Sequence, residues 1–264
     1  MKRVLTALLA GGLAVAGVLL LDSPLVFWVA FALMVGCTFE YVALARRVHP
    51  EFPRSLLLVA VPLLASTWVL PVAVAPFMLL ASAPLAFAIV LLWAPTPRSA
   101  AGSLGWASFG LPYLVLPIWA LYELHRLDRR LLLLLLVSVW ANDSIAFLVG
   151  SRWGRRKLAP SLSPNKTWEG SVGGLLGSAV VAWGGLVWAG IEPRWPFLGS
   201  FLVSGFAAQL GDLVESMLKR AAEVKDSGRI VPGHGGLLDR LDAIILAGPV
   251  FYGLLQATGL AAGL

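Results

Sequence analysis

Long apolar runs separated by short polar connections dominate the chain. A helix needs about 20 mostly apolar residues to cross the hydrocarbon core, because its backbone amides must be hydrogen-bonded within the segment. Nine runs meet this requirement: 4–21, 25–45, 55–72, 75–93, 104–122, 131–150, 171–190, 196–217 and 243–262. The pattern predicts an all-α fold, a polytopic transmembrane helical bundle of about nine spans.

Prolines make the third and fourth spans the least regular. Pro62, Pro71, Pro76 and Pro84 interrupt one long apolar stretch. A proline in a membrane helix marks either a kink or an end, so eight or ten spans stay open as alternatives.

The first apolar run has two interpretations. A basic start and the small residues at 14–16 are typical of a cleavable signal peptide. The run continues past that point, however, and the next one begins at Leu25. We therefore expect an uncleaved first span.

The composition favours a bilayer as the solvent. Hydrophobic residues make up 59% of the chain and charged residues only 13%, roughly half the charged share of a soluble domain. The net charge of +6 comes from basic residues in short connections, which favours anionic lipid and nucleotide phosphate over nucleic acid as partners. Cys37 is the single cysteine, so an intrachain disulfide is excluded.

The basic residues also predict an orientation. With a cytoplasmic N-terminus, sixteen Lys and Arg residues fall on the inside and four on the outside: Arg126, Arg129, Arg130 and Arg194. This agrees with the positive-inside rule. The cluster at 126–130 is a local exception, or the sign of a miscounted span.

The acidic residues concentrate in the second half of the chain. Nine of fourteen lie from Asp143 onward. We therefore predict N-terminal scaffold spans over 1–130 and a C-terminal catalytic region over 131–264. Glu40 and Tyr41, in the second span, are expected to serve structure.

The segment 211–242 carries the densest polar chemistry. One helical face near the end of the eighth span carries Asp212, Glu215, Ser216 and Lys219. A lone carboxylate there costs about 2.5–3.5 kcal/mol and demands a partner. That partner is either a metal ion or a salt bridge from Lys219 or Arg240.

A second acidic group, Asp239 and Asp242, opens the ninth span. Two acidic clusters around a basic loop suit a phosphate substrate bridged by Mg²⁺. In the glycine turn between them, the amides of Gly235 and Gly236 can approach phosphate oxygens. His234 is either a general acid or phosphate donor, or a hydrogen-bonded turn residue.

Two further groups precede the seventh span. Lys166, with Asn165 and Thr167, suits binding of a triphosphate, although an interfacial anchor explains the same loop. Asn142 and Asp143, inside the sixth span, lie near an active cavity or form interhelical hydrogen bonds.

At this point the sequence resembles the CDP-diacylglycerol synthase family. The similarity lies in Ser216-x-Leu218-Lys219-Arg220, Lys225-Asp226-x-Gly228 and Pro232-x-His234-Gly235-Gly236-Leu237-x-Asp239-Arg240-Leu241-Asp242, within 27 residues. Val231 departs from the pattern, which has Leu, Ile or Phe there. Segments 141–143 and 163–170 also look like family segments.

The resemblance implies a reaction and its setting. Phosphatidate and CTP would give CDP-diacylglycerol and pyrophosphate in phospholipid biosynthesis, with Mg²⁺ required and a second cation left open. The enzyme would be a homodimer in the bacterial inner membrane, in contact with membrane lipid, with its site toward the cytoplasm.

The resemblance also implies roles for residues. The metal ligands would be Asp212 and Asp239, with Asp242 as a further candidate. The catalytic group would be Lys219, Arg220, Lys225, Asp226, His234 and Arg240. The substrate-binding group would be Asn142, Asp143, Asn165, Lys166, Thr167, Ser216, Gly235 and Gly236.

Two other functions stay open. A CTP-using polyprenol kinase would release CDP and phosphorylate an alcohol. An ion or phosphate transporter also places charges within its spans, but the charged clusters here lie toward one face.

Overall fold

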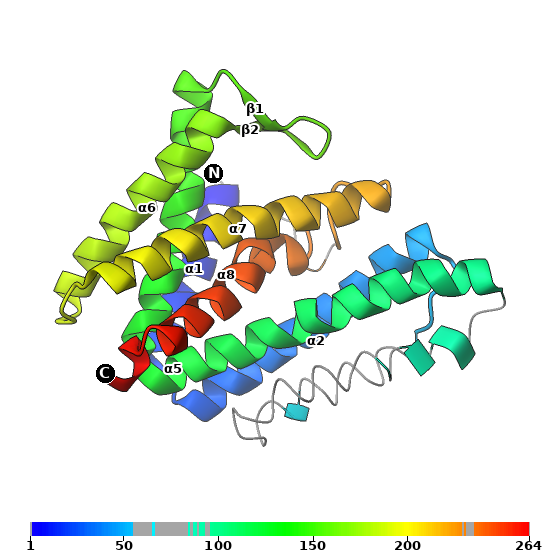
Figure 1. Cartoon of the computed structure of the whole chain (residues 1–264), viewed down its shortest axis with the longest axis horizontal. Coiled ribbons are helices and arrows are strands. Elements are labelled where there is room, and N and C mark those ends of the chain that lie inside the picture. Colours follow the sequence, from blue (N-terminus) through cyan, green and yellow to red (C-terminus); the bar gives the residue numbers. More distant parts are fainter. Residues whose placement is uncertain are drawn as a thin grey trace. The chain divides into compact units, whose positions relative to one another are not determined.

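The computed structural model describes residues 2–54, 65–66, 84, 87–88, 90–92, 96–228, 230 and 235–263. The predicted third and fourth spans lie largely outside these residues. The helices are α1 (Lys2–Leu20), α2 (Ser23–Val48), α5 (Pro97–Trp153), α6 (Trp168–Trp188), α7 (Trp195–Ala221) and α8 (Leu238–Ala257), followed by the 3₁₀ helix η1 (Leu260–Gly263) (Figure 1).

Four of these helices are long and apolar enough to cross a bilayer. They are α2, α5, α6 and α7. Within α1, Gly11–Leu20 is a shorter apolar helix. The described residues therefore have the helices of a membrane protein, whereas the predicted count of nine spans is not confirmed.

The long helix α5 contains two of the predicted spans. Its 57 residues would extend about 85 Å at 1.5 Å per residue, far more than the roughly 30 Å of a hydrocarbon core. At Asp128 the backbone is extended, with φ −161° and ψ 114°. This break separates the predicted spans 104–122 and 131–150.

The prediction of a purely α-helical fold needs one correction. Strands β1 (Lys157–Ala159) and β2 (Ser163–Thr167) form an antiparallel pair in which Lys157 lies opposite Thr167. The segment predicted as a loop is therefore a strand that leads directly into α6. The Thr167 hydroxyl accepts a hydrogen bond from the Gly170 amide and caps that helix.

The chain divides into two compact units. The first comprises Met1–Val26, Ala120–Met217 and Leu241–Leu264, and the second comprises Phe27–Trp119 and Leu218–Arg240. Each unit is built from segments that are separated along the chain, and the second half of the chain contributes to both units.

Each unit has its own close helix packing. In the first, the rings of Phe201 in α7 and Phe251 in α8 lie 4.5 Å apart between centroids. In the second, the Tyr41 hydroxyl of α2 donates to the Trp106 carbonyl of α5 over 2.8 Å. Gly110 leaves room for the Tyr41 ring.

Arginines of the 126–130 cluster, the local exception to the predicted positive-inside pattern, contact backbone carbonyls. Arg129 donates to the Leu19 carbonyl over 2.9 Å, and Arg130 donates to the Ala189 carbonyl over 2.8 Å. These carbonyls lie at the C-terminal ends of α1 and α6, where helices carry partial negative charge. Two of the three arginines in the 126–130 cluster therefore contact helix ends, whereas Arg126 pairs with Glu123 over 3.1 Å.

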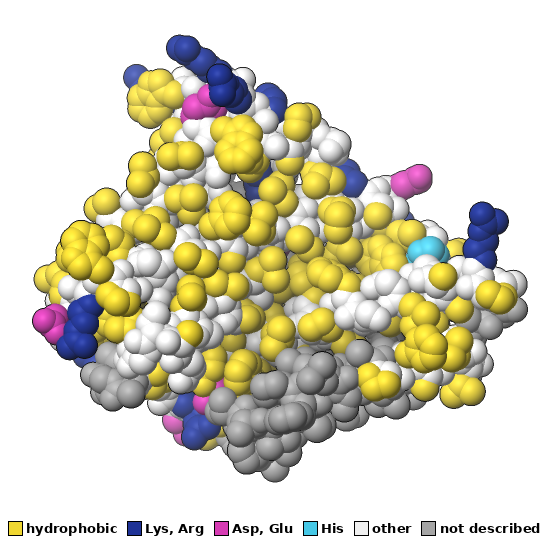
Figure 2. All heavy atoms as spheres, viewed as in Figure 1, with side chains coloured by type: hydrophobic (Ala, Val, Ile, Leu, Met, Phe, Trp, Pro, Cys, Tyr) yellow, Lys and Arg dark blue, Asp and Glu magenta, His cyan; other side chains and the backbone are white. Residues whose placement is uncertain are grey.

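Hydrophobic side chains cover most of the face drawn in Figure 2, and charged side chains appear in small groups. Large exposed residues along α6 include Val172, Leu176 and Val180. Trp188 and Trp195, on either side of the α6–α7 turn, are about three-quarters exposed. Such a surface suits lipid contact, with tryptophans at its edge.

Candidate functional site

In the first unit, the centre of the polar chemistry is Asp212 of α7. Its Oδ2 lies 2.5 Å from the Lys166 ammonium of β2, and its Oδ1 lies 3.4 Å from the Ser216 hydroxyl. The salt-bridge partner of Asp212 is therefore Lys166, whereas the sequence suggested Lys219 or Arg240. Both side chains of the pair are about a quarter exposed, at 26% and 29%, so a substrate can reach them.

Asp143 joins this pair from α5. Its carboxyl interacts electrostatically with both Asp212 and Lys166, and its side chain is exposed. Two carboxylates and one ammonium from three elements thus interact electrostatically with one another. Opposite charges at this range suit a site for a cation, a phosphate or both.

Asn142, the neighbour of Asp143, is fully buried and forms interhelical hydrogen bonds. Its amide donates to the Gly205 carbonyl over 2.7 Å, and its oxygen accepts from Gln209 over 2.8 Å. Gln209 also donates to the Ser171 carbonyl over 3.0 Å. This network ties α5, α6 and α7 together, as the alternative interpretation of Asn142 predicted.

Sequence reasoning missed Gln209. A single glutamine in an apolar run gave no spacing or motif to mark it. The one available signal was that Gln209, like Asn142, is an amide side chain inside an apolar span. Buried amides in membrane helices form hydrogen bonds with one another.

The backbones of α7 and α8 meet beside Asp212. A Cβ added at Gly211 would lie 2.4 Å from the Asp242 carbonyl oxygen. The Asp242 carboxylate accepts a hydrogen bond from the Ala243 amide over 2.7 Å. Asp212 in α7 and Asp242 in the second turn of α8 are therefore held close together within the first unit.

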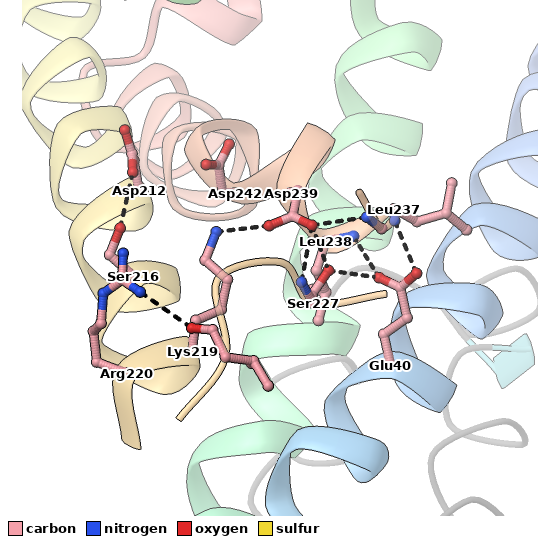
Figure 3. Close-up of polar contacts among 12 residues, drawn as sticks. Glu40, Asp212, Ser216, Lys219, Arg220, Ser227, Leu237, Leu238, Asp239 and Asp242 are labelled. Carbon is pink, nitrogen blue, oxygen red and sulfur yellow. Dashed lines mark hydrogen bonds and ion pairs between the residues drawn. The ribbon is translucent and has the colours of Figure 1, made fainter. Parts of the chain in front are cut away.

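In the second unit, Lys219 and Asp239 form an ion pair. The ammonium lies 2.6 Å from Asp239 Oδ1, and the side chains are only 13% and 8% exposed. Figure 3 shows Lys219 pointing toward Asp239 from the end of α7. This pair is more buried than Lys166 and Asp212.

The other oxygen of Asp239 is held by the chain itself. Oδ2 accepts from the Ser227 amide at 2.9 Å, from the Ser227 hydroxyl at 3.0 Å and from the Gly236 amide at 2.7 Å. Gly235 has φ +85°, a left-handed conformation that glycine adopts without strain. The glycine turn therefore folds back onto Asp239 and fixes the orientation of its carboxylate.

Glu40 of α2 completes this arrangement. Its carboxylate accepts from the amides of Leu237 at 3.0 Å and Leu238 at 2.9 Å, and from the Ser227 hydroxyl at 2.9 Å. Figure 3 shows Ser227 between Glu40 and Asp239. The sequence predicted a structural Glu40, and Ser227 was missed as its partner.

The other predicted catalytic residues of this unit are exposed. They are Arg220, Lys225, Asp226 and Arg240. Arg220 donates to the Val224 carbonyl over 3.2 Å. Just beyond the last residue of α7, Glu223 has φ 55°, and the Val224 amide donates to the Lys219 carbonyl, which is typical of a helix C-cap. His234 lies outside the described residues.

Within the described part of the chain, no three His, Cys, Asp or Glu side chains gather as a metal site. This does not suit a metal enclosed by protein ligands. Mg²⁺, however, takes one or two carboxylates and completes its shell with water and substrate phosphate. The carboxylates of Asp212 and Asp239 have the donor chemistry for that ion.

Comparison with known proteins adds an independent finding. The sequence profile described as "Cytidylyltransferase family" matches residues 1–258. A phosphatidate cytidylyltransferase from Pseudomonas aeruginosa is 35% identical in an alignment of 273 positions, which covers 98% of this chain and 97% of the relative.

Two further relatives match over shorter lengths. Proteins named phosphatidate cytidylyltransferase from Staphylococcus aureus and Bacillus subtilis are 44% and 46% identical over 135 and 122 residues. These alignments cover about half of each chain. Together with the profile match over nearly all of its length, they show that the chain belongs to the cytidylyltransferase family.

Proposed function

We propose that this chain transfers CMP from CTP to phosphatidate, giving CDP-diacylglycerol and pyrophosphate. The observation that carries this proposal is the similarity to the Pseudomonas aeruginosa phosphatidate cytidylyltransferase over 98% of this chain and 97% of that protein. The apolar helices and the lysine–aspartate pairs support it, because both reactants are anionic and one is a membrane lipid.

The reaction makes one bond and breaks one. An oxygen of the phosphatidate phosphate attacks the α-phosphorus of CTP. The bond from that phosphorus to the oxygen bridging toward the β-phosphate breaks, and pyrophosphate leaves. A phosphate monoester carries about −1.5 to −2 charge at neutral pH, so the nucleophile needs no general base.

The protein's task is therefore positioning and charge balance. Lys166 and Lys219 each present an ammonium group with three donors, next to Asp212 and Asp239. We assign them to reactant phosphates. Asn165 is exposed beside Lys166 and would donate to the same phosphate group.

Mg²⁺ is the proposed cofactor, and the carboxylates of Asp212 in the first unit and Asp239 in the second are the proposed protein ligands. When bound, it would neutralise charge on the triphosphate and on the leaving pyrophosphate. Asp143 and Asp242 would support Asp212, since one interacts with Asp212 and the other lies against Gly211.

We place the enzyme in the bacterial inner membrane with its site toward the cytoplasm, where CTP is made. The distribution of Lys and Arg supports this orientation. A homodimer is the proposed assembly. Mass measurement of the purified protein in detergent, with the detergent mass subtracted, tests the dimer.

Product analysis with labelled CTP tests the reaction. Label at the α-phosphate should move into an organic-soluble lipid, and label at the γ-phosphate should appear as pyrophosphate. Both must depend on phosphatidate. CDP together with a γ-labelled lipid would point to a polyprenol kinase and contradict the proposal.

A transporter predicts a different outcome. Sealed vesicles containing the protein would exchange phosphate or ions across the membrane without consuming any nucleotide. That result, with no lipid labelled, would also overturn the proposed reaction.

A further inference from the structure

We propose that Glu40 is a positioning residue that orients the Asp239 carboxylate through Ser227 and the first turn of α8. This rests on the proposed function, in which Asp239 serves the reacting phosphates. All of the contacts involved lie within the second unit. The residue comes from α2, far from the motif in sequence, in a region otherwise predicted to be scaffold.

The first part of the argument is how firmly Glu40 is held. It is 5% exposed and accepts three hydrogen bonds, from the Leu237 amide, the Leu238 amide and the Ser227 hydroxyl. Helix α8 begins at Leu238, so the carboxylate lies at a helix N-terminus, where negative charge is favourable. Charge-assisted bonds of this kind are among the stronger ones in proteins.

The second part is the link through Ser227. Its Oγ lies 2.9 Å from Glu40 Oε2 and 3.0 Å from Asp239 Oδ2. A hydroxyl has one proton, so the two carboxylates share a single donor. The Ser227 amide also donates to Asp239. A change at Glu40 therefore alters the hydrogen bonding of Asp239 through the shared Ser227 hydroxyl.

The third part is the close fit around Glu40. A Cβ at Gly228 would lie 2.3 Å from Glu40 Oε1, and one at Gly236 would lie 2.3 Å from Oε2. One turn earlier on α2, a Cβ at Gly36 would lie 2.4 Å from Leu237 Cδ1. The motif thus approaches α2 as closely as glycine permits.

These contacts leave Asp239 with one oxygen fixed and one directed at Lys219. Oδ2 is held by three donors, while Oδ1 contacts the ammonium. A shift of Ser227 or of the first turn of α8 would rotate Oδ1. Displacement of a reacting group by 1 Å can cost about 100-fold in rate.

The kinetic test uses four variants. Glu40→Gln keeps the volume but puts an NH₂ group against backbone amides, Ser227→Ala removes the shared hydroxyl, and the double variant combines them. Asp22→Asn is the matched control, because Asp22 also accepts from a helix-start amide, that of Leu25, over 3.1 Å.

Glu40→Gln should lower kcat by about 10- to 100-fold, the range expected for misplacement of a reacting group, with the KM for CTP within a factor of two. The kcat of the double variant should lie within a factor of three of that of Glu40→Gln, because both substitutions act on Asp239 through the same Ser227 hydroxyl. Asp22→Asn should match the wild type.

A second measurement does not depend on turnover. Binding of Mn²⁺, followed by the loss of its free EPR signal, should weaken about tenfold in Glu40→Gln and stay unchanged in Asp22→Asn. Where Glu40→Gln fails to fold, Ser227→Ala and Glu40→Asp take its place in both measurements.

The outcomes separate the two proposals. No lipid labelling by the wild type would defeat the proposed function, and Mn²⁺ binding would then decide the role of Glu40. Wild-type kcat and Mn²⁺ affinity in a folded Glu40→Gln would show that Glu40 only caps α8. An absence of Mn²⁺ binding in the wild type would also overturn the positioning role.

Discussion

At the scale of single residues, the two lysine–aspartate pairs differ in burial. Lys166 and Asp212 are about a quarter exposed, whereas Lys219 and Asp239 are 13% and 8% exposed. Removing one partner of a buried pair leaves a charge that water cannot solvate. The two pairs therefore differ in how much the fold depends on them.

Lys219→Met should destabilise the protein by about 3 kcal/mol, because it leaves the buried Asp239 carboxylate without its ammonium. Arg220→Met, at the next position, is the matched control. Arg220 is exposed, so its replacement should change stability by less than about 0.5 kcal/mol. Unfolding in detergent, followed by tryptophan fluorescence, measures both.

The result depends on the contrast between the neighbours. Equal losses of stability in Lys219→Met and Arg220→Met would mean that the Lys219–Asp239 pair is not buried as described.

The sequence identified the polar residues that lie inside apolar spans, but it did not identify their interaction partners. Asp212 demanded a counter-charge, and the structure supplies Lys166 from 46 positions away in the chain. Glu40 likewise finds Ser227 only through tertiary packing. Spacing along a helix reveals partners three or four residues apart, and none of these pairs has that spacing.

At the scale of elements, close backbone contact sets the geometry of the acidic helix ends. Gly211 brings α7 against the Asp242 carbonyl of α8. Glycine is the residue that permits this approach, since any side chain would meet the carbonyl oxygen.

Gly211→Ala should therefore destabilise the protein by about 1–3 kcal/mol, the usual cost of overpacking, and lower its activity. Gly199→Ala is the control on the same helix, because a Cβ there meets nothing within 4 Å. It should be neutral or stabilising by up to about 1 kcal/mol, since alanine favours helix. Equal stability of the two variants would contradict the α7–α8 contact.

Thr167 tests the strand-to-helix junction. Thr167→Ala removes the hydroxyl that caps α6 and should cost about 1 kcal/mol. Thr167→Ser keeps the cap and should recover most of that loss. Thermal unfolding of both variants in the same detergent is the measurement, and an unchanged midpoint in Thr167→Ala would exclude the capping role.

The elements that the sequence predicted well are the long apolar ones. The predicted spans 25–45, 171–190 and 196–217 correspond to α2, α6 and α7, because their apolar runs are continuous. The strands β1 and β2 were missed, since three and five residues with little alternation give no strand signal. The break at Asp128, in contrast, lies between the two predicted spans 104–122 and 131–150, so the sequence predicted it.

At the scale of the whole molecule, the described residues present apolar helices together with two lysine–aspartate pairs, one in each unit. Membership in the cytidylyltransferase family gives these charges a chemical context. The proposed reaction needs cationic groups, because nucleotide and lipid phosphates must be brought together against their mutual repulsion.

The most direct test of this account is the rate of phosphatidate-dependent lipid labelling from α-labelled CTP in Asp212→Asn, Asp239→Asn and the double variant. Each single change should lower the rate by at least about 100-fold, as loss of a preorganised charge does. The double variant should also label lipid at least about 100-fold more slowly than the wild type, because each carboxylate has a role in the proposed reaction. Near wild-type labelling by either single variant would contradict the account.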